Sequence, residues 1–209
     1  MATTTSHAST AALSTVTLEV TDPAAAGTFL AALGLDTRIA LRASDAPTQG
    51  FRGWALALTV PGPATVDAFV ADAVAAGATV VKPAARSLWG YGAVVQAPDG
   101  TLWKIATGTK KDTGPATRAI DGIVLLLGVG SVKATREFYV SQGLTVARSF
   151  GGKYTEFTGT PGAVTLALYK HRALAKELGV PAEGTGSHRL TLTGTGTAFT
   201  DPDGFAWEA

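Results

Sequence analysis

Residues Ser14–Leu35 read STVTLEVTDPAAAGTFLAALGL, and residues Ile123–Leu144 read IVLLLGVGSVKATREFYVSQGL. In both stretches an apolar strand leads through a turn into a helix that carries an aromatic residue. A glycine then stands where a helix C-terminus needs a left-handed backbone. Phe29 of the first stretch aligns with Phe138 of the second. The pattern predicts an internal repeat, with one strand–helix unit opening each half of the chain.

A second repeated motif lies further along each half. Ala97–Gly100 reads APDG and precedes TLWKIA, while Asp201–Gly204 reads DPDG and precedes FAWEA. Pro-Asp-Gly before a short apolar segment is typical of a turn that feeds a strand. The polar stretch Thr107–Arg118 lies between the halves and is typical of a linker. We therefore expect a leader at residues 1–12, a domain at 13–107, a linker at 108–118 and a second domain at 119–209.

The composition excludes several classes of protein. The chain has 209 residues, of which 46% are hydrophobic and 16% charged, so a fully disordered chain is excluded. Lys and Arg number 17 against 16 Asp and Glu, which leaves no basic field for nucleic acid. The absence of cysteine excludes disulfides and thiolate metal sites. The most apolar run, Ile123–Val129, is far shorter than the ~20 residues of a membrane span. We expect no membrane association and a cytoplasmic location.

Hydrophobic periodicity and turn residues predict the elements. The predicted helices span Pro23–Leu33, Ala64–Ala76, Val132–Gln142 and His171–Leu178. The predicted strands span Thr15–Val20, Thr37–Arg42, Trp54–Val60, Thr79–Lys82, Gly92–Gln96, Leu102–Ala106, Gly122–Val129, Thr145–Phe150, Tyr154–Thr158, Val164–Tyr169, His188–Thr193 and Phe205–Glu208. The second half has no counterpart of the Ala64–Ala76 helix, so its domain is expected to have one helix fewer.

These motifs together resemble the vicinal oxygen chelate superfamily, which includes glyoxalase I, extradiol dioxygenases and bleomycin-resistance proteins. The resemblance extends from about Ser14 to Ala209, and its carriers include Trp89–Ala106 and Asp201–Glu208. It implies an α+β fold of tandem halves, built from βαβββ modules that form cupped mixed sheets with helices outside. It also implies that a small molecule binds on the concave face of such a sheet.

In that superfamily a divalent metal is held by His and Glu side chains from different strands. By that resemblance Lys104 stands where the first half should carry Glu, and a cation there would repel a metal. In the second half Ala167 replaces one expected Glu, whereas His188 and Glu208 match ligand positions. Two interpretations stay open: His188 and Glu208 hold a metal, or His188 lines the pocket and Glu208 is the remnant of a ligand set.

Aromatic residues border the predicted cups and suit a planar or apolar ligand. The candidate ligand-binding residues are Trp54, Trp89, Tyr91, Lys104, Tyr154 and Tyr169. Strand alternation predicts that Trp54 and His188 face the cup and that Trp103 and Trp207 face away from it.

The leading hypothesis is a metal-independent, cofactor-free protein that binds an apolar or aromatic small molecule, similar to glyoxalase/bleomycin-resistance proteins. The alternative is a lyase or dioxygenase-like enzyme with a divalent metal ion at His188 and Glu208. A third hypothesis is acid–base catalysis without a cofactor, with Glu208 or His188 as the base. The sheet face left uncovered in the second half is compatible with a homodimer.

Overall fold

The computed structural model describes residues 12–112 and 114–209, so all but Ala12 of the predicted leader lies outside the described residues. Its helices are α1 (Pro23–Ala32), α2 (Pro63–Ala75), α3 (Val132–Ser141) and α4 (His171–Leu178). Its strands are β1 (Leu13–Val20), β2 (Ala40–Ala43), β3 (Thr48–Gly50), β4 (Trp54–Thr59), β5 (Thr79–Ser87), β6 (Gly90–Gln96), β7 (Leu102–Thr107), β8 (Gly122–Val129), β9 (Val146–Phe150), β10 (Tyr154–Phe157), β11 (Val164–Lys170), β12 (Gly184–Gly186), β13 (Leu190–Gly194), β14 (Phe199–Thr200) and β15 (Ala206–Glu208). The predicted helices are confirmed, whereas the short strands β3, β12 and β14 were not predicted.

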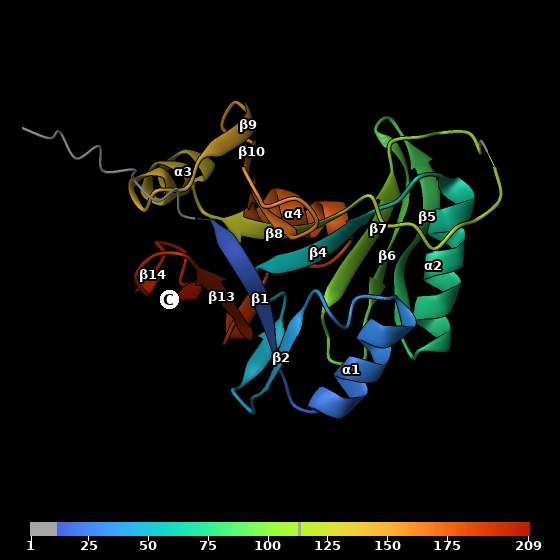
Figure 1. The fold of residues 1–209 in the computed structure, drawn as a ribbon, viewed down its shortest axis with the longest axis horizontal. Coiled ribbons are helices and arrows are strands. Elements are labelled where there is room, and N and C mark those ends of the chain that lie inside the picture. The colour runs from blue at the N-terminus through green and yellow to red at the C-terminus, as the bar shows by residue number, and fades with distance from the viewer. Residues whose placement is uncertain (1–11, 113) are drawn as a thin grey trace, which may run out of the picture.

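Eight strands form the large sheet, in the order β5-β6-β7-β4-β8-β11-β10-β9. It contains two complete βαβββ units, β4–α2–β5–β6–β7 and β8–α3–β9–β10–β11. In each unit the first and last strands pair in parallel. The units join where β4 and β8 pair antiparallel, with Ala57 opposite Val124 (Figure 1).

Five strands form the small sheet, in the order β14-β15-β13-β1-β2. Strand β1 pairs antiparallel with β13, placing Val16 opposite Leu192. The small sheet thus combines two reduced units: β1–α1–β2 from the first half, and β13 to β15, without a helix, from the second. Both sheets therefore draw strands from both halves of the chain.

Local sequence explains where the helices begin and end. The Asp22 carboxylate accepts hydrogen bonds from the backbone N–H groups of Ala24 and Ala25, at 2.9 and 3.0 Å, and Pro23 occupies the first helical turn. Ser131 caps α3 in the same way. Helix α4 ends at Gly179, whose φ of 78° is the left-handed conformation that glycine adopts at low cost.

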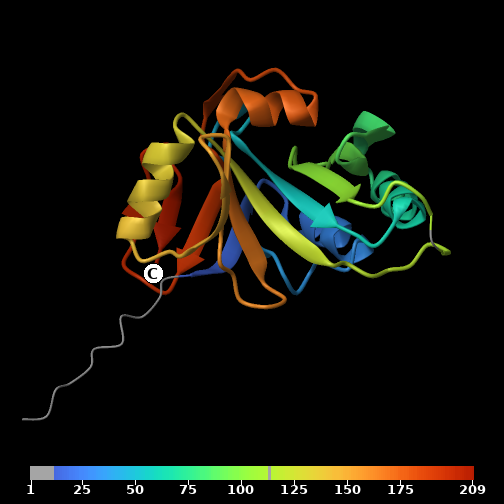
Figure 2. The same cartoon turned by 90° about the horizontal axis from the view of Figure 1, so that it is seen from above.

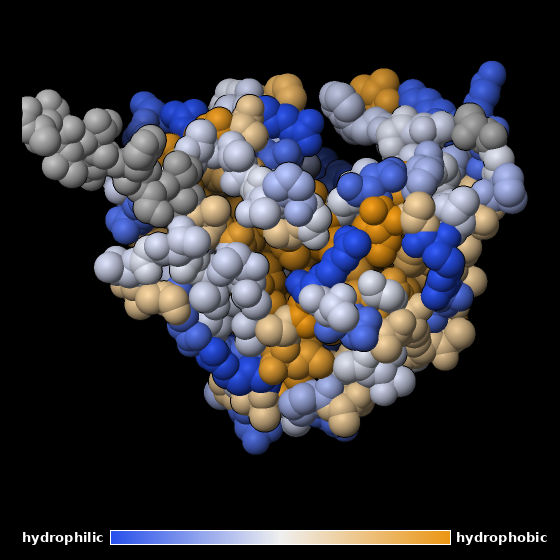
Figure 3. All heavy atoms as spheres, viewed as in Figure 1, coloured by the Kyte–Doolittle hydropathy of each residue, from blue (hydrophilic) through white to orange (hydrophobic). Residues whose placement is uncertain are grey.

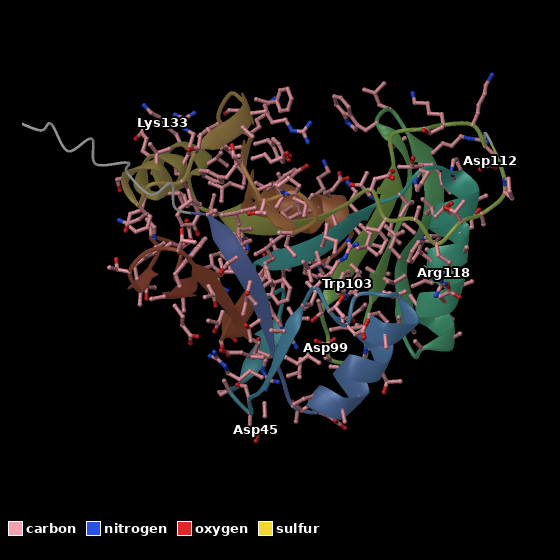
Figure 4. All side chains as sticks on the ribbon, viewed as in Figure 1. Asp45, Asp99, Trp103, Asp112, Arg118 and Lys133 are labelled. Carbon is pink, nitrogen blue, oxygen red and sulfur yellow. The ribbon has the colours of Figure 1, made fainter. Side chains whose placement is uncertain are left out.

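The main core lies between one face of the large sheet and the small sheet, with α1, α2 and α3 completing it. It joins Leu56 and Leu125 of the large sheet to Val16 and Leu192 of the small one. Trp103 of β7 is fully buried there (Figure 4). Such a core supplies the burial of apolar surface that stabilises both sheets together.

Helix α4 packs on the opposite face of the large sheet, which we call the α4 face. Leu174 and Leu178 of α4 contact a second apolar cluster that includes Ala55, Leu126 and Ala167. Figure 2 shows α4 standing apart from the other three helices. The prediction of helices outside the cup therefore holds for α1, α2 and α3 but not for α4. No helix in residues 12–112 and 114–209 is long and apolar enough to cross a membrane.

Candidate ligand site

Strand register arranges the α4 face in rows. Ala57, Lys104, Val124 and Thr165 lie side by side on β4, β7, β8 and β11, and we call them the central row. The neighbouring row is fully buried where α4 packs against it, whereas all four residues of the central row are partly exposed. Helix α4 thus covers part of this face and leaves a strip of small and apolar side chains open.

Two tyrosines and an ion pair form one wall of this strip. The rings of Tyr154 and Tyr169 meet edge to face with centroids 5.0 Å apart. The Tyr154 hydroxyl donates to Glu156, whose Oε2 also accepts hydrogen bonds from the Arg148 guanidinium at 3.0 and 2.7 Å. Burial is the largest cause that raises the pKa of both tyrosines. The wall therefore offers neutral phenols and one paired carboxylate.

A second ion pair ties α4 to the strands beneath it. The Lys104 Nζ lies 2.6 Å from Glu177 Oε1 at the end of α4. The Lys82 Nζ donates to the backbone carbonyl of Glu177 at 3.0 Å. The hydrogen bond from Lys104 lowers the pKa of Glu177, so the Glu177 carboxyl group is ionised at neutral pH. Lys104 thus links the open strip to the end of the helix.

Two hairpins flank the entrance to the α4 face. Figure 3 shows the surface hollowed between the β9–β10 hairpin and the β5–β6 hairpin. The end of β9 carries Phe150, which is 64% exposed, and the β5–β6 turn carries Leu88 and Trp89, which are 77% and 83% exposed. Large apolar side chains exposed at the edge of a hollow indicate a surface for apolar contact.

The side chains of the central row do not fit a divalent metal. Alanine and valine offer no ligand atom, the Thr165 hydroxyl is a weak neutral ligand, and Lys104 places a positive charge beside them. Within the described residues no group of three or more His, Cys, Asp and Glu side chains is placed to hold a metal ion. We therefore derive no chemistry through a metal on this face.

His188 and Glu208 have separate partners. The His188 Nδ1 lies 2.7 Å from the carbonyl oxygen of Arg52, and the ring stacks on Phe205 with centroids 4.2 Å apart. Glu208 lies exposed on the small sheet and accepts two hydrogen bonds from the Arg42 guanidinium, at 2.8 and 2.7 Å. These hydrogen bonds lower the pKa of Glu208. The structure does not bring these two side chains to a common site.

The predicted orientation of Trp54 is wrong. Trp54 is 2% exposed and packs in the main core, where its indole N–H donates to the His188 carbonyl at 2.7 Å. The segment Trp54–Thr59 alternates large side chains with alanine, and the large ones face the core. Ala55 and Ala57 face the other way, where Ala55 is buried in the cluster that contains the α4 leucines and Ala57 stays partly exposed. The prediction that Trp103 and Trp207 pack away from the cup is confirmed, since both are buried in the main core.

Of the six candidate ligand residues, Lys104, Tyr154 and Tyr169 gather on the α4 face. Tyr91 points the other way, toward α2, where its hydroxyl donates to Asp67 at 2.8 Å. Trp89 lies at the tip of the β5–β6 hairpin. Three further charged residues of the site were missed from the sequence: Arg148, Glu156 and Glu177. Glu156 could have been found, because it follows Tyr154 by two residues and so shares its face of the strand.

No family model matches the chain, and no curated protein matches it. Solved structures do. Glyoxalase I from Zea mays superposes with a TM-score of 0.58 at 13% identity, over 94% of this chain and 91% of that one. A candidate dioxygenase from Bacillus subtilis superposes with a TM-score of 0.52 at 14% identity, over 92% of this chain and 71% of that one. The chain has the vicinal oxygen chelate fold. The resemblance predicted from the repeated motifs is thereby confirmed at the level of the fold.

A vicinal oxygen chelate fold does not by itself decide the chemistry of a site. In this chain the two complete βαβββ units share the large sheet, and the α4 face is the side of that sheet opposite the main core.

Proposed function

We propose that this protein binds an apolar or aromatic small molecule on the α4 face and does so without a metal ion. The observation that carries the proposal is the central row, because Ala57, Lys104, Val124 and Thr165 provide no set of metal ligands. Small side chains there leave room for a ligand above the sheet. Concave, mostly apolar surfaces with a few polar groups are what small-molecule sites require.

The wall beside the central row supplies orientation. The edges and faces of Tyr154 and Tyr169 suit a flat ring, which gains from tilted or offset aromatic contact. Glu156 and Lys104 are each held by an opposite charge, so they offer hydrogen bonds without placing an unpaired charge against an apolar ligand. The exposed aromatics of the two hairpins add apolar contact at the entrance.

The alternative functions receive less support. A metal at His188 and Glu208 would need the Glu208 carboxylate, which the Arg42 guanidinium already engages with two hydrogen bonds. A general base works best in a partly buried place that raises its pKa, whereas Arg42 lowers the pKa of an exposed Glu208. These contacts favour ligand binding over catalysis by this pair.

The test combines metal analysis with a ligand screen. Protein purified without a metal-affinity tag is analysed for bound metal beside His188→Ala, and then screened against planar aromatic compounds by ligand-observed NMR. We expect binding that a chelator does not change and that Tyr169→Ala weakens by about tenfold or more, as loss of an aromatic contact and its buried area implies. Tyr91→Phe, on the far side of the sheet, is the matched control. One equivalent of metal, lost in His188→Ala, would establish the metal-dependent alternative instead.

The proposal includes a cytoplasmic protein and a homodimer. The support for a dimer is the small sheet, whose outer face carries Glu19, Arg42 and Glu208 and is covered by no helix of residues 12–112 and 114–209. Sedimentation at two protein concentrations tests it, and a monomer at both would remove this part of the proposal.

A further inference from the structure

A cavity of about 260 Å³ lies apart from the central row, at the end of the large sheet where β4 and β7 begin and β6 ends. None of the central-row residues lines it. Its walls are mostly apolar and come from Phe51, Trp54, Leu102, Val180 and Pro181. The last two belong to the segment that follows α4.

One cation lines this cavity. The Arg52 side chain is partly buried, and its Nη2 donates to the backbone carbonyl of Asp99 at 2.6 Å. No carboxylate oxygen of residues 12–112 and 114–209 lies within 4.0 Å of the guanidinium. Burial is the largest cause acting on the pKa of Arg52 and lowers it, while the charge of Asp99 raises this pKa and that of Arg189 lowers it. A guanidinium has five N–H donors, so this partly desolvated cation has donors available to a ligand.

The Arg52 guanidinium lies against the turn between β6 and β7. Asp99 lies at that turn (Figure 4), and its carboxylate accepts hydrogen bonds from the Thr101 hydroxyl and backbone N–H. Gly100 has a φ of 86°, and a Cβ there would lie 2.7 Å from Arg52 Nη2. Glycine therefore serves both the turn and the close approach of the guanidinium.

We propose that this cavity binds a small molecule in which one carboxylate is joined to a flat apolar body. The carboxylate pairs with the Arg52 guanidinium, whose fork of donors matches its two oxygens. The apolar body lies against Phe51, Trp54 and Leu102. A monoanion suits the site better than phosphate, because a second negative charge would meet Glu183, which also lines the cavity.

The test compares benzoate with benzamide, which has the same shape but no charge. Binding to the full chain is measured by calorimetry at low ionic strength, where a partly exposed ion pair is least screened. We expect benzoate to bind with a Kd at least tenfold lower than that of benzamide. Arg52→Gln should remove this preference, and Arg136→Gln, a matched loss of charge on α3 away from both sites, should leave it unchanged.

Other outcomes would overturn the proposal. Equal affinities for benzoate and benzamide, or no binding of either, would show that Arg52 recognises no carboxylate. Inorganic phosphate binding as tightly as benzoate would point to a general anion site. A preference lost in Arg148→Gln, a variant on the α4 face, but kept in Arg52→Gln would place benzoate on that face, against this site and in favour of the proposed function. If Arg52→Gln does not fold, the NMR resonance of Arg52 Nε in the wild-type chain provides the test. A shift of this resonance on addition of benzoate would support the site, and no shift would count against it.

Discussion

Two buried tryptophans differ in what their indole N–H groups contact. Trp103 is fully buried, and its N–H finds no hydrogen-bond partner among the described residues, whereas the Trp54 N–H donates to a carbonyl at 2.7 Å. Leaving a buried polar group unpaired costs about 1–3 kcal/mol. Replacing Trp103 with phenylalanine removes its unpaired N–H group. Replacing Trp54 with phenylalanine instead leaves the His188 carbonyl without the hydrogen bond that Trp54 donates. We expect Trp103→Phe to lower the free energy of unfolding by about 1–2 kcal/mol less than Trp54→Phe does. Urea titration measures both, and equal losses would contradict this account.

Raised tyrosine pKa values set the stability of the protein at alkaline pH. Burial, with Asp201 nearby, raises the pKa of Tyr139, and burial with Glu156 raises that of Tyr154. The folded state then holds these protons at a pH where the unfolded chain, with a tyrosine pKa of about 10, releases them. The free energy of unfolding should therefore fall as the pH rises above about 10.

The test of this alkaline effect is Tyr154→Phe, because Tyr139→Phe would also remove the hydrogen bond that the Tyr139 hydroxyl donates to Oδ2 of the buried Asp201. Urea titrations between pH 8 and 11 should show a shallower loss of stability in the variant than in the wild type. Identical slopes would mean that Tyr154 ionises as easily in the folded protein as in the unfolded chain.

At the scale of elements, the Lys104–Glu177 ion pair fixes the end of α4. Its hydrogen bond lowers the pKa of Glu177, so the stabilisation is present above the unfolded glutamate pKa of about 4.3 and is lost as the pH falls through the folded pKa. The side chains are 27% and 44% exposed, so we expect Glu177→Gln to cost about 0.5–1 kcal/mol at pH 7 and almost nothing near pH 3.

The expected local effect is faster amide hydrogen exchange in α4 of Glu177→Gln at pH 7. Glu137→Gln is the matched control, because Glu137 pairs with Lys133 on the exposed surface of α3 at 4.0 Å. Exchange that is unchanged in Glu177→Gln, or equally changed in both variants, would show that the ion pair does not hold α4.

Elements were predictable where local chemistry decides them. Capping by Asp22 and the helical spacing of apolar residues located the helices, and repeated motifs led to the fold. Which side of β4 points to the main core was not predictable from the sequence. The segment Trp54–Thr59 has large residues on one side and alanines on the other, and either side can pack against another layer. Only α4, which lies more than 100 residues later in the chain, shows that Ala55 on the alanine side is buried beneath a helix. The pairing of β12 with β3 is missed for the same reason, since it joins distant short segments.

At the scale of the whole molecule, strands of the two halves pair with each other in both sheets. The β1–β13 pairing completes the small sheet and the β4–β8 pairing completes the large one. One apolar core contains residues from Leu13 to Trp207. Each half alone would expose the strand edges and the apolar faces that the other half covers. The halves should therefore fold together rather than as independent domains.

This interdependence predicts a single cooperative unfolding transition for the full chain. Leu192→Ala, at a fully buried position in β13, should destabilise the molecule by about 2–5 kcal/mol and move the whole transition without splitting it. Cleavage at a protease site inserted between residues 108 and 118 should leave two fragments that separate only on unfolding. Circular dichroism and size-exclusion chromatography measure these outcomes. A separated half that unfolds cooperatively would contradict this prediction. Without the β1–β13 and β4–β8 pairings, a half keeps its structure only if its own apolar core is sufficient, so such a result would mean that each half is a stable domain by itself.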